Sequence, residues 1–413
     1  MESIDRQVSI YMNGSEFGDP QIKEMMTQEL RQRLIEAEAE GRPLRVYCGY
    51  DVTAPDIHLG HTITMRKLRQ FQEFGHEVTF LIGTFTTLIG DPSDRDEARA
   101  EALKEDIERN AQTYAEQAFK ILDREKTKVR YNYEWLSKLS FADVINMASY
   151  FTVQQFLIRD RLRNRYEKND PIWLRELLYP LAQGYDAVSL QADVQLGATE
   201  QLFNLMAARR LQEVFGQKPQ ICITFPVLVG TDGVHRMSKS RGNYIGIAEP
   251  PDEIYGKTMS INDDLIMPYF ELVTDVQEEE LAEFRRQLEN DTVNPMVLKK
   301  RLARELVTQF YDEKAATEAE ENFARVVQKR EVPDEIPEVR TSFKAQQLPT
   351  NSALIYQAGF ASSSSAAFRL VMQGGVTIDG KKINDNSPAY TDGSIIKVGK
   401  RRYFRVVDAD KTS

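Results

Sequence analysis

The sequence predicts an α/β protein in which a parallel sheet with a helical insertion is followed by an all-helical segment and a small α+β unit. Three observations carry this prediction. A strand, a helix and a second strand follow one another between residues 44 and 83, which is the repeating unit of a parallel sheet. Strand signals then stop at about residue 255. An acidic, proline-containing linker at 331–341 leads into a short basic region.

Length and composition limit the possible classes of protein. The chain has 413 residues, too many for one compact core, which indicates two or three domains. Its 41% hydrophobic and 28% charged residues are typical of a globular protein. The first residues lack the pattern of a secretion signal, and no apolar run reaches membrane-spanning length. The two cysteines, Cys48 and Cys222, lie too far apart for a CxxC site, so we expect a reducing cytoplasm.

The strand and helix signals of the first 255 residues alternate as a parallel sheet requires. LRVYCGYD at 44–51 and EVTFLIG at 77–83 are expected to be strands, with a helix of apolar spacing between them. A second helical stretch at about 141–190 forms the insertion and leads into the strands DVQLG and QICITFPVLVG. Before it comes a charged helix whose apolar face consists of Leu103, Ile107, Ala111, Tyr114, Ala118 and Ile121.

After residue 255 the sequence first predicts helices alone and then a small unit of helices and short strands. Residues 256–330 contain segments such as LIMPYFELV with helical period and good helix formers. The later run SSSSAAFRLVMQGG could be a low-complexity linker, but the apolar pattern after the serines predicts that they cap a helix ended by Gly374. Short strands with DG and GK turns complete the unit at 342–413. From Thr341 on there are ten basic and five acidic residues, although the whole chain has a net charge of −10.

Two of the four histidines stand in PDIHLGH, residues 55–61, between a strand and a helix. A helix N-terminus presents unpaired N–H groups and a partial positive charge, which favour phosphate. His58 and His61 can add hydrogen bonds, and Gly60 leaves room for a flat base. We therefore interpret PDIHLGH as a nucleotide site, although the sequence lacks GxGxxG and GxxxxGK loops. Core packing and metal binding are the alternatives, but no cysteine or histidine cluster supplies further metal ligands.

A second stretch, RMSKSRGN at 236–243, lies in a glycine-containing loop after a predicted strand. Its cations and hydroxyls suit a leaving pyrophosphate, although a solvated basic turn has the same composition. In order, spacing and context the two stretches resemble the HIGH and KMSKS signatures of class I aminoacyl-tRNA synthetases. With YCGYD, LIGDPS and YPLAQGYDAVSLQADVQLGATEQLFN at 179–204, the chain resembles the bacterial tyrosyl-tRNA synthetases from about residue 40 to its end.

The resemblance implies a Rossmann-like catalytic domain at 1–255, a helical anticodon-binding domain at 256–330 and a linker at 331–341. It also implies an RNA-binding module at 342–413, similar to one shared by a ribosomal small-subunit protein and some pseudouridine synthases. The implied partners are tyrosine, ATP with Mg²⁺ on its phosphates, tRNA(Tyr) and a second copy of the chain contacted through the helical insertion. No tightly bound metal and no membrane are expected.

The implied reaction is activation of tyrosine to tyrosyl-adenylate, followed by transfer to the 3′ end of tRNA(Tyr). The substrate carboxylate is already a nucleophile, so catalysis would depend on positioning and charge stabilisation. By resemblance, the catalytic residues are His58, His61, Arg236, Lys239 and Ser240. The tyrosine contacts are Tyr47, Asp91, Tyr179, Gln183, Asp186 and Gln201, with Tyr47 and Asp186 on the phenolic hydroxyl. The ATP contacts are Cys48, Asp51, Thr53, Gly60, Thr64, Gly197, Glu200, Met237 and Lys239.

Some positions depart from the family pattern. Arg236 stands where lysine is usual, which keeps the charge but changes the geometry. GATEQ at 197–201 replaces G-G-S-D-Q, so Glu200 takes the place of a ribose-binding aspartate with a longer arm, and Ala198 crowds a position that is usually glycine. The C-terminal helix carries only Arg369, where related modules are more basic. RNA contacts are therefore expected at Lys381, Lys382, Lys400, Arg401 and Arg402, which could equally be solubilising surface.

Other interpretations stay open. Small-cofactor nucleotidyltransferases also use an HxGH loop, but they lack the second loop and are usually much shorter. A non-enzymatic RNA-binding or splicing protein derived from a synthetase would have no need of His58, His61 and Lys239. A tryptophanyl-tRNA synthetase would bind an indole, whereas Tyr47 and Asp186 suit a phenol. Simpler roles for single residues are a core aromatic for Tyr47, a helix-end charge for Asp186 and a turn residue for Asp91.

Overall fold

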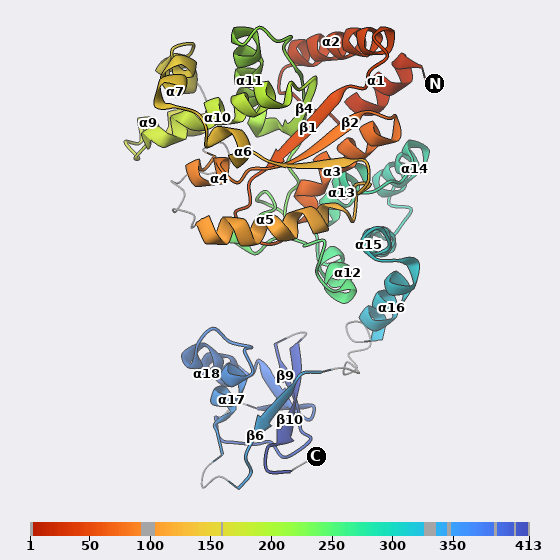
Figure 1. Cartoon of the computed structure of the whole chain (residues 1–413). Helices are drawn as coiled ribbons and strands as arrows, with labels where there is room; N and C mark the ends of the chain where they lie inside the picture. Colours follow the sequence, from red (N-terminus) through yellow and green to blue (C-terminus); the bar gives the residue numbers. More distant parts are fainter. Residues whose placement is uncertain are drawn as a thin grey trace. The chain divides into compact units, whose positions relative to one another are not determined.

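The computed structural model describes residues 3–91, 104–157, 160–325, 336–344, 348–383, 386–399 and 402–411 (Figure 1). The chain forms two compact units, Met1–Ala316 and Thr317–Ser413, and each is described by itself. Within the described ranges, no helix has both the length and the apolar character needed to cross a bilayer.

A five-stranded parallel sheet is the centre of the first unit (Figure 1). Its strands are β1 (Arg45–Tyr50), β2 (Glu77–Ile82), β3 (Thr127–Tyr131), β4 (Val194–Ala198) and β5 (Ile221–Phe225). They lie in the order β3-β2-β1-β4-β5, all parallel. The direction of chain progression reverses between β1 and β4, so a crevice forms at their carboxyl ends, where such folds bind ligands.

The sequence predicted four of these strands and missed β3. The segment TKVRY has two basic side chains and no fully buried residue, because β3 lies at the edge of the sheet. It therefore shows neither an apolar run nor a buried face. The N-terminal helices α1 (Ile4–Met12) and α2 (Pro20–Ala39) were not predicted either.

Helices cover both faces of the sheet (Figure 1). On one face lie α3 (Leu59–Glu73) and α5 (Lys104–Ala118), and on the other lie α10 (Leu174–Leu190) and α11 (Leu202–Val214). Short helices α4 (Thr86–Ile89) and α6 (Tyr133–Leu136) follow β2 and β3. The predicted insertion consists of α7 (Phe141–Ala148), α8 (Val153–Leu157), α9 (Asp160–Glu167) and α10.

The segment predicted to be helical forms helices throughout its described part. They are α12 (Pro251–Met259), α13 (Ile266–Val273), α14 (Glu278–Glu289), α15 (Pro295–Phe310) and α16 (Glu313–Phe323). Arg66 of α3 donates to Gln309 of α15 at 2.9 Å and pairs with Asp275, which follows α13. These contacts hold α13 and α15 against α3 within the first unit, whereas α16 crosses the boundary between the two units, and the four-part domain division stays a prediction.

The second unit is a small mixed sheet with two helices. Its strands are β6 (Glu338–Thr341), β7 (Val376–Ile378), β8 (Lys381–Ile383), β9 (Ile395–Val398) and β10 (Arg402–Asp408), in the order β6-β10-β9-β7-β8. The helices α17 (Asn351–Gln357) and α18 (Ser364–Met372) pack against it. The hydroxyl of Ser363 caps α18 by accepting from the N–H of Ala366 at 3.1 Å, and Gly374 follows its end at φ 67°. The predicted serine cap and glycine stop are therefore confirmed, while α17 and β6 were missed.

Candidate active site

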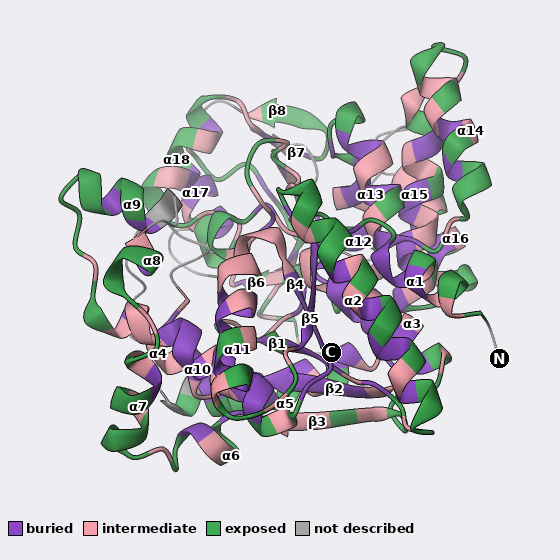
Figure 2. Ribbon diagram, turned by 90° about the horizontal axis from the view of Figure 1, so that it is seen from above, coloured by how far each residue is buried: buried purple, intermediate pink, exposed green. Residues whose placement is uncertain are grey.

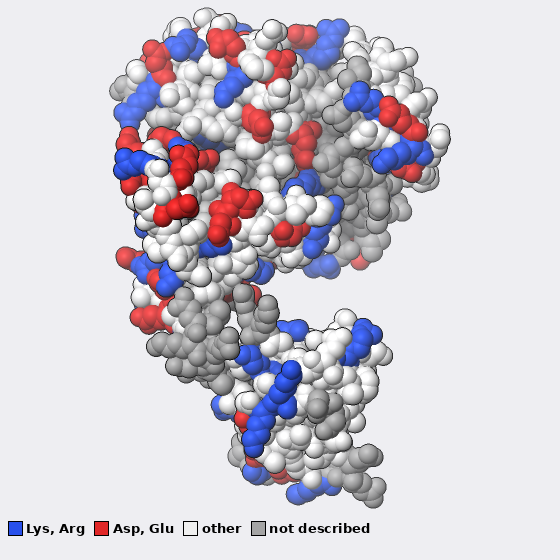
Figure 3. Space-filling view, turned by 180° about the vertical axis from the view of Figure 1, so that it is seen from behind, with Lys and Arg blue, Asp and Glu red and all other residues white. Residues whose placement is uncertain are grey.

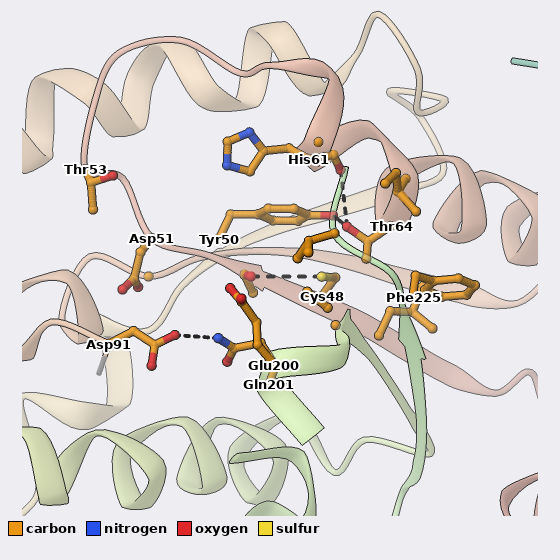
Figure 4. Close-up of a pocket in the computed structure, with 18 of the residues that line it drawn as sticks. Cys48, Tyr50, Asp51, Thr53, His61, Thr64, Asp91, Glu200, Gln201 and Phe225 are labelled. Atoms are coloured by element: carbon orange, nitrogen blue, oxygen red, sulfur yellow. Dashed lines mark hydrogen bonds between the residues drawn. The ribbon is translucent and has the colours of Figure 1, made fainter. Parts of the chain in front are cut away.

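The residues predicted to contact tyrosine and ATP line one pocket of about 560 Å³ (Figure 4). It lies at the carboxyl ends of β1 and β4, and its volume suits a small-molecule ligand. The predicted residues that line it are Tyr47, Cys48, Asp51, Thr53, His58, Gly60, His61, Thr64, Asp91, Tyr179, Gln183, Asp186, Gly197, Glu200, Gln201, Arg236, Met237, Lys239 and Ser240. The fold thus brings the whole predicted set together, and the role of each residue stays a prediction.

Two histidines cap the first turn of α3 with their own rings. The Nδ1 of His58 accepts from the N–H of Gly60 at 3.2 Å, and the Nδ1 of His61 accepts from the N–H of His58 at 3.2 Å. Because Nδ1 is the acceptor in both rings, the proton of each neutral ring is on Nε2. Burial lowers the pKa of both histidines, that of His61 to about 3. Both rings are therefore neutral N–H donors at physiological pH.

Gly60 lies against the first of these rings. A Cβ at this position would meet the Cε1 atom of the His58 ring at 3.0 Å. The sequence analysis explained Gly60 by the space that a base needs, and the structure adds a second reason. A side chain here would displace the ring that caps α3.

The deep end of the pocket is polar and shielded from water. Asp186 of α10 is 2% exposed and accepts from the indole Nε1 of Trp135 at 2.7 Å and from the Nδ2 of Asn132 at 3.2 Å. Burial nevertheless raises the pKa of Asp186 to about 8. Beside it, burial and then the charge of Asp186 raise the pKa of Tyr47 well above its usual value. Within the described residues, the Tyr47 hydroxyl makes no hydrogen bond of regular geometry, although Gln220 lies near it.

An unpaired buried hydroxyl is unfavourable, so a ligand that brings a polar group to Tyr47 would stabilise the site. The side-chain oxygen of Gln183 also has no partner within the described part of the chain. Sequence reasoning missed Trp135 and Asn132. Both follow the unpredicted strand β3, and no motif in YNYEWL marks Asn132 as a pocket residue or Trp135 as a partner of Asp186.

The middle of the pocket is a network of acids and their donors (Figure 4). The Nε2 of Gln201 donates to Asp91 at 2.5 Å. Asp51 accepts from the hydroxyl of Tyr179 at 3.2 Å and from Thr86 at 2.7 Å. Asp51 was predicted on the ATP side and Tyr179 on the tyrosine side, so this contact joins the two predicted subsites.

Near the other wall, the hydroxyl of Tyr50 lies 2.8 Å from that of Thr64. Burial raises the pKa of Cys48 to about 11, so its thiol stays protonated. Tyr50, Thr64 and Cys48 are uncharged, so this part of the wall predicted to contact ATP is neutral. Within the described residues, no group of three or more His, Cys, Asp or Glu side chains is placed to hold a metal ion.

The loop after β5 contacts two opposite walls of the pocket. Arg236 pairs with Glu200 at 2.5 Å on the side of β4, and the ammonium of Lys239 donates to the carbonyl of Asp56 in PDIHLGH. Burial lowers the pKa of Lys239 to about 8. The buried side chain of Asn243 holds the loop, because it accepts from the N–H of Ser238 at 2.8 Å and donates to the carbonyl of Arg236 at 3.1 Å. Asn243 stands in the RMSKSRGN stretch, but the sequence analysis gave it no role.

The predicted RNA contacts belong to the second unit. Lys381, Lys382 and Arg402 are exposed, and the guanidinium of Arg402 lies 5.6 Å from the centre of the Phe360 ring. Lys400 and Arg401 lie outside the described residues. On the face of this unit seen in Figure 3, basic side chains outnumber acidic ones.

Comparison with known proteins gives two family matches. Residues 39–328 match the model described as tRNA synthetases class I (W and Y), and residues 353–396 match the S4 domain. The chain is 48% identical over 401 residues to the tyrosine–tRNA ligase of Dehalococcoides mccartyi strain CBDB1, covering 96% of this chain and 100% of the relative. It is 46% identical over 408 residues to that of Moorella thermoacetica, covering 98% and 96%.

Among solved structures, the fold is similar to the tyrosyl-tRNA synthetase of Archaeoglobus fulgidus complexed with L-tyrosine. The TM-score is 0.61 at 24% identity, over 77% of this chain and 99% of that one. The tyrosyl-tRNA synthetase of Aeropyrum pernix gives a TM-score of 0.60 at 19% identity, over 79% and 97%. At these identities the likeness is one of fold.

Proposed function

The chain belongs to the class I tRNA synthetases of the tryptophan and tyrosine type, and from this premise we propose how its pocket ligates tyrosine to tRNA. The reaction uses ATP to activate tyrosine and then transfers it to tRNA. One observation supports the assignment of roles above all others. A buried polar site suited to a phenol and a helix N-terminus suited to phosphate share a single pocket.

Tyrosine binds with its ring in the deep end. Its phenolic hydroxyl meets Tyr47 and Asp186, which gives the Tyr47 hydroxyl the partner that it lacks. The substrate ammonium lies near Asp91, Tyr179 and Gln183, and its carboxylate lies near Gln201. Phenylalanine in the same place would leave the buried Tyr47 hydroxyl without a partner and would bring no donor to Asp186, and an unpaired buried group is costly.

ATP binds between PDIHLGH and the loop after β5. The Nε2–H groups of His58 and His61, with the N-terminus of α3, donate to the phosphates. Lys239 and Arg236 face the β- and γ-phosphates, and Glu200 faces the ribose. We propose that Mg²⁺ arrives with ATP as a counter-ion of its phosphates, whose oxygen atoms are ligands that Mg²⁺ prefers.

Activation is a displacement at phosphorus. A carboxylate oxygen of tyrosine attacks the α-phosphorus, the bond from the α-phosphorus to the bridging oxygen breaks, and pyrophosphate leaves with the electron pair. Negative charge builds on the phosphate oxygens in the transition state, and preorganised N–H donors and cations stabilise it there. A hydroxyl at the 3′ end of tRNA then attacks the tyrosyl carbonyl carbon, and AMP leaves.

The helices of the insertion carry many exposed residues (Figure 2), and several of these residues are apolar, which supports a homodimer. Phe141 is 81% exposed and Leu174 is 74% exposed, and Ile145, Val153 and Trp173 are also exposed. Apolar patches of this kind mark protein contacts. If two copies meet through this surface, Phe141→Asp should yield a monomer in sedimentation experiments, while Val234→Asp, an equally exposed change in the loop after β5, should not.

The second unit is proposed to hold tRNA through Lys381, Lys382, Lys400, Arg401 and Arg402, and the helices of 256–330 to read the anticodon. A chain that ends near Arg340 should still activate tyrosine but transfer it poorly to tRNA. Its tRNA binding should also depend less steeply on salt, because fewer phosphates are neutralised. Wild-type aminoacylation by the shortened chain would contradict this role.

The experiment that tests the whole proposal is ATP–pyrophosphate exchange with each of the twenty amino acids. Tyrosine should support exchange, and tryptophan and phenylalanine should not. Exchange with tryptophan would indicate the other specificity of the family. No exchange with any amino acid would contradict the proposed chemistry.

A further inference from the structure

An ion pair lies on the nucleotide side of the pocket and joins two residues that are 36 positions apart in the sequence. Arg236 is in the loop after β5, and Glu200 is in the short helix η1 (Thr199–Gln201) after β4. The Nη1 of Arg236 and the Oε1 of Glu200 are 2.5 Å apart. The two side chains are 26% and 17% exposed, so water screens the pair only in part.

Both partners extend from anchored backbone. The carbonyl of Arg236 accepts from the buried Asn243 at 3.1 Å, and Arg236 forms a β-bridge with Val229. Glu200 follows Ala198, which pairs with Phe225 in the sheet. The carboxylate of Glu200 points into the pocket (Figure 4). Because each arm starts from a fixed point, the contact between them defines where the Glu200 carboxylate lies.

The chemistry of the two side chains fits a paired role. Glutamate has one more methylene group than aspartate and therefore more rotamers to lose when it is ordered. A guanidinium carries five donors in a planar fork, so a contact through one nitrogen is compatible with further partners, and a carboxylate has about four acceptor sites. Holding the carboxylate before ATP arrives removes part of the ordering entropy from the binding step.

We propose that Arg236 is a positioning residue for Glu200 and that the pair acts as one unit in binding the ribose of ATP. This inference rests on the function proposed above. In it, the guanidinium keeps the Glu200 carboxylate directed at the ribose hydroxyls, while Arg236 itself also faces the phosphates. The orientation of the Glu200 carboxylate then depends on Arg236, and the loss of either side chain removes the paired contact with the ribose.

A double-mutant cycle tests the pairing. The KM for ATP and the rate constant at saturating ATP are measured in tyrosine-dependent pyrophosphate exchange for Glu200→Gln, Arg236→Gln and the double variant. Each single change should raise the KM about tenfold, and the double variant should be no worse than the larger single effect, because the first change already breaks the unit. Glu200→Gln should raise the KM for ATP more than it lowers the rate constant at saturating ATP, because a ribose contact is made in the ground state as well as in the transition state.

A matched ion pair outside the pocket provides the control. Lys257 and Glu249 are 2.6 Å apart and 32% and 20% exposed, close to the values for the pocket pair. Lys257→Gln and Glu249→Gln should leave the KM for ATP unchanged.

A double-variant KM close to the product of the two single effects, about a hundredfold, would show that Glu200 and Arg236 act independently and would overturn the inference. A wild-type chain without tyrosine-dependent exchange would instead contradict the proposed function. The two failures are therefore distinguishable.

Discussion

The two ends of the pocket are built in different ways. The phenol end is formed by a strand and a helix, and Tyr47 and Asp186 are 1% and 2% exposed. The phosphate end is formed by a helix N-terminus and a loop, and Arg236 is 26% exposed. In the proposed function, recognition of the tyrosine side chain therefore depends on groups fixed by the core, whereas the chemistry depends on groups that contact one another across the pocket.

The electrostatics differ in the same way. At the phenol end burial raises the pKa of an acid, and two neutral donors hold its oxygens. At the phosphate end burial lowers the pKa of Lys239 and both histidines. The first end should therefore control which amino acid binds, and the second should control how fast it reacts. Four predictions test this division, from the largest expected effect to the smallest.

Lys239→Ala should slow tyrosyl-adenylate formation by about 10²- to 10³-fold, the usual loss when a donor to a developing charge is removed. The dissociation constant of tyrosine should barely change, because Lys239 is proposed to act on the leaving group in the transition state. Single-turnover kinetics and equilibrium binding measure the two quantities, with Lys218→Ala on the surface as control. A large rise in the dissociation constant of tyrosine, with an unaltered rate of adenylate formation, would contradict the assignment of Lys239 to the phosphate end.

At pH 9, where Asp186 with its pKa of about 8 is mostly ionised, Asp186→Asn should reduce the preference for tyrosine over phenylalanine by roughly 30-fold, since hydrogen bonds to charged groups contribute about 1.5–3 kcal/mol. Asparagine also presents an NH₂ group to one of the two donors that Asp186 now accepts from. Tyr47→Phe should have a smaller effect, roughly fivefold, because it removes a neutral partner. The measurement is kcat/KM for both amino acids, with Tyr255→Phe, a buried tyrosine outside the pocket, as control.

If the preference stays at the wild-type value in both pocket variants, the hydroxyl is recognised elsewhere. A change in the rate at saturating tyrosine without a change in preference would also count against the division between the two ends.

Trp135→Phe should reduce the same preference by a few fold while leaving most of the packing intact. The indole N–H donates to Asp186 at 2.7 Å, so its removal leaves the carboxylate with one fewer partner and a higher pKa. Trp173→Phe is the control, because it makes the same substitution at an exposed tryptophan. An unchanged preference in Trp135→Phe would mean that the orientation of Asp186 does not depend on this donor.

The preference for tyrosine should rise with pH by a few fold between pH 7 and 9. The pKa of Asp186 is about 8 without ligand, so the ionised fraction increases through this range, and the ionised form is the stronger acceptor for the phenol. The rise should vanish in Asp186→Asn. Measurements should stay below the pKa of free tyrosine's phenol, near 10. A flat wild-type profile would show that Asp186 does not change its charge in this range.

The residues proposed for the phosphate end are easier to recognise in the sequence than the groups that surround the phenol end. PDIHLGH and RMSKSRGN are local stretches, so a pattern within a few residues identifies them. The groups that orient Asp186 lie in YNYEWL, at the end of an edge strand that has no apolar run and no fully buried residue, so Trp135 and Asn132 were missed. The contact between Glu200 and Arg236 joins residues 36 positions apart, which only the pairing of β4 with β5 brings together. A single sequence shows the short motifs of a site, whereas the side chains that orient the residues of those motifs are brought to them only by the tertiary structure.

The reciprocal cap at the start of α3 restricts the evolution of this site. His58 and His61 each use one ring nitrogen to cap the helix, and the proposed function assigns the other nitrogen to the substrate, so on that proposal a substitution is selected on stability and on catalysis at once. Among uncharged side chains, asparagine and glutamine also combine an acceptor with an N–H donor. Asparagine is in addition favoured at helix N-caps. The first turn of α3 should therefore admit very few viable sequences, and asparagine at position 58 is the replacement most compatible with both demands.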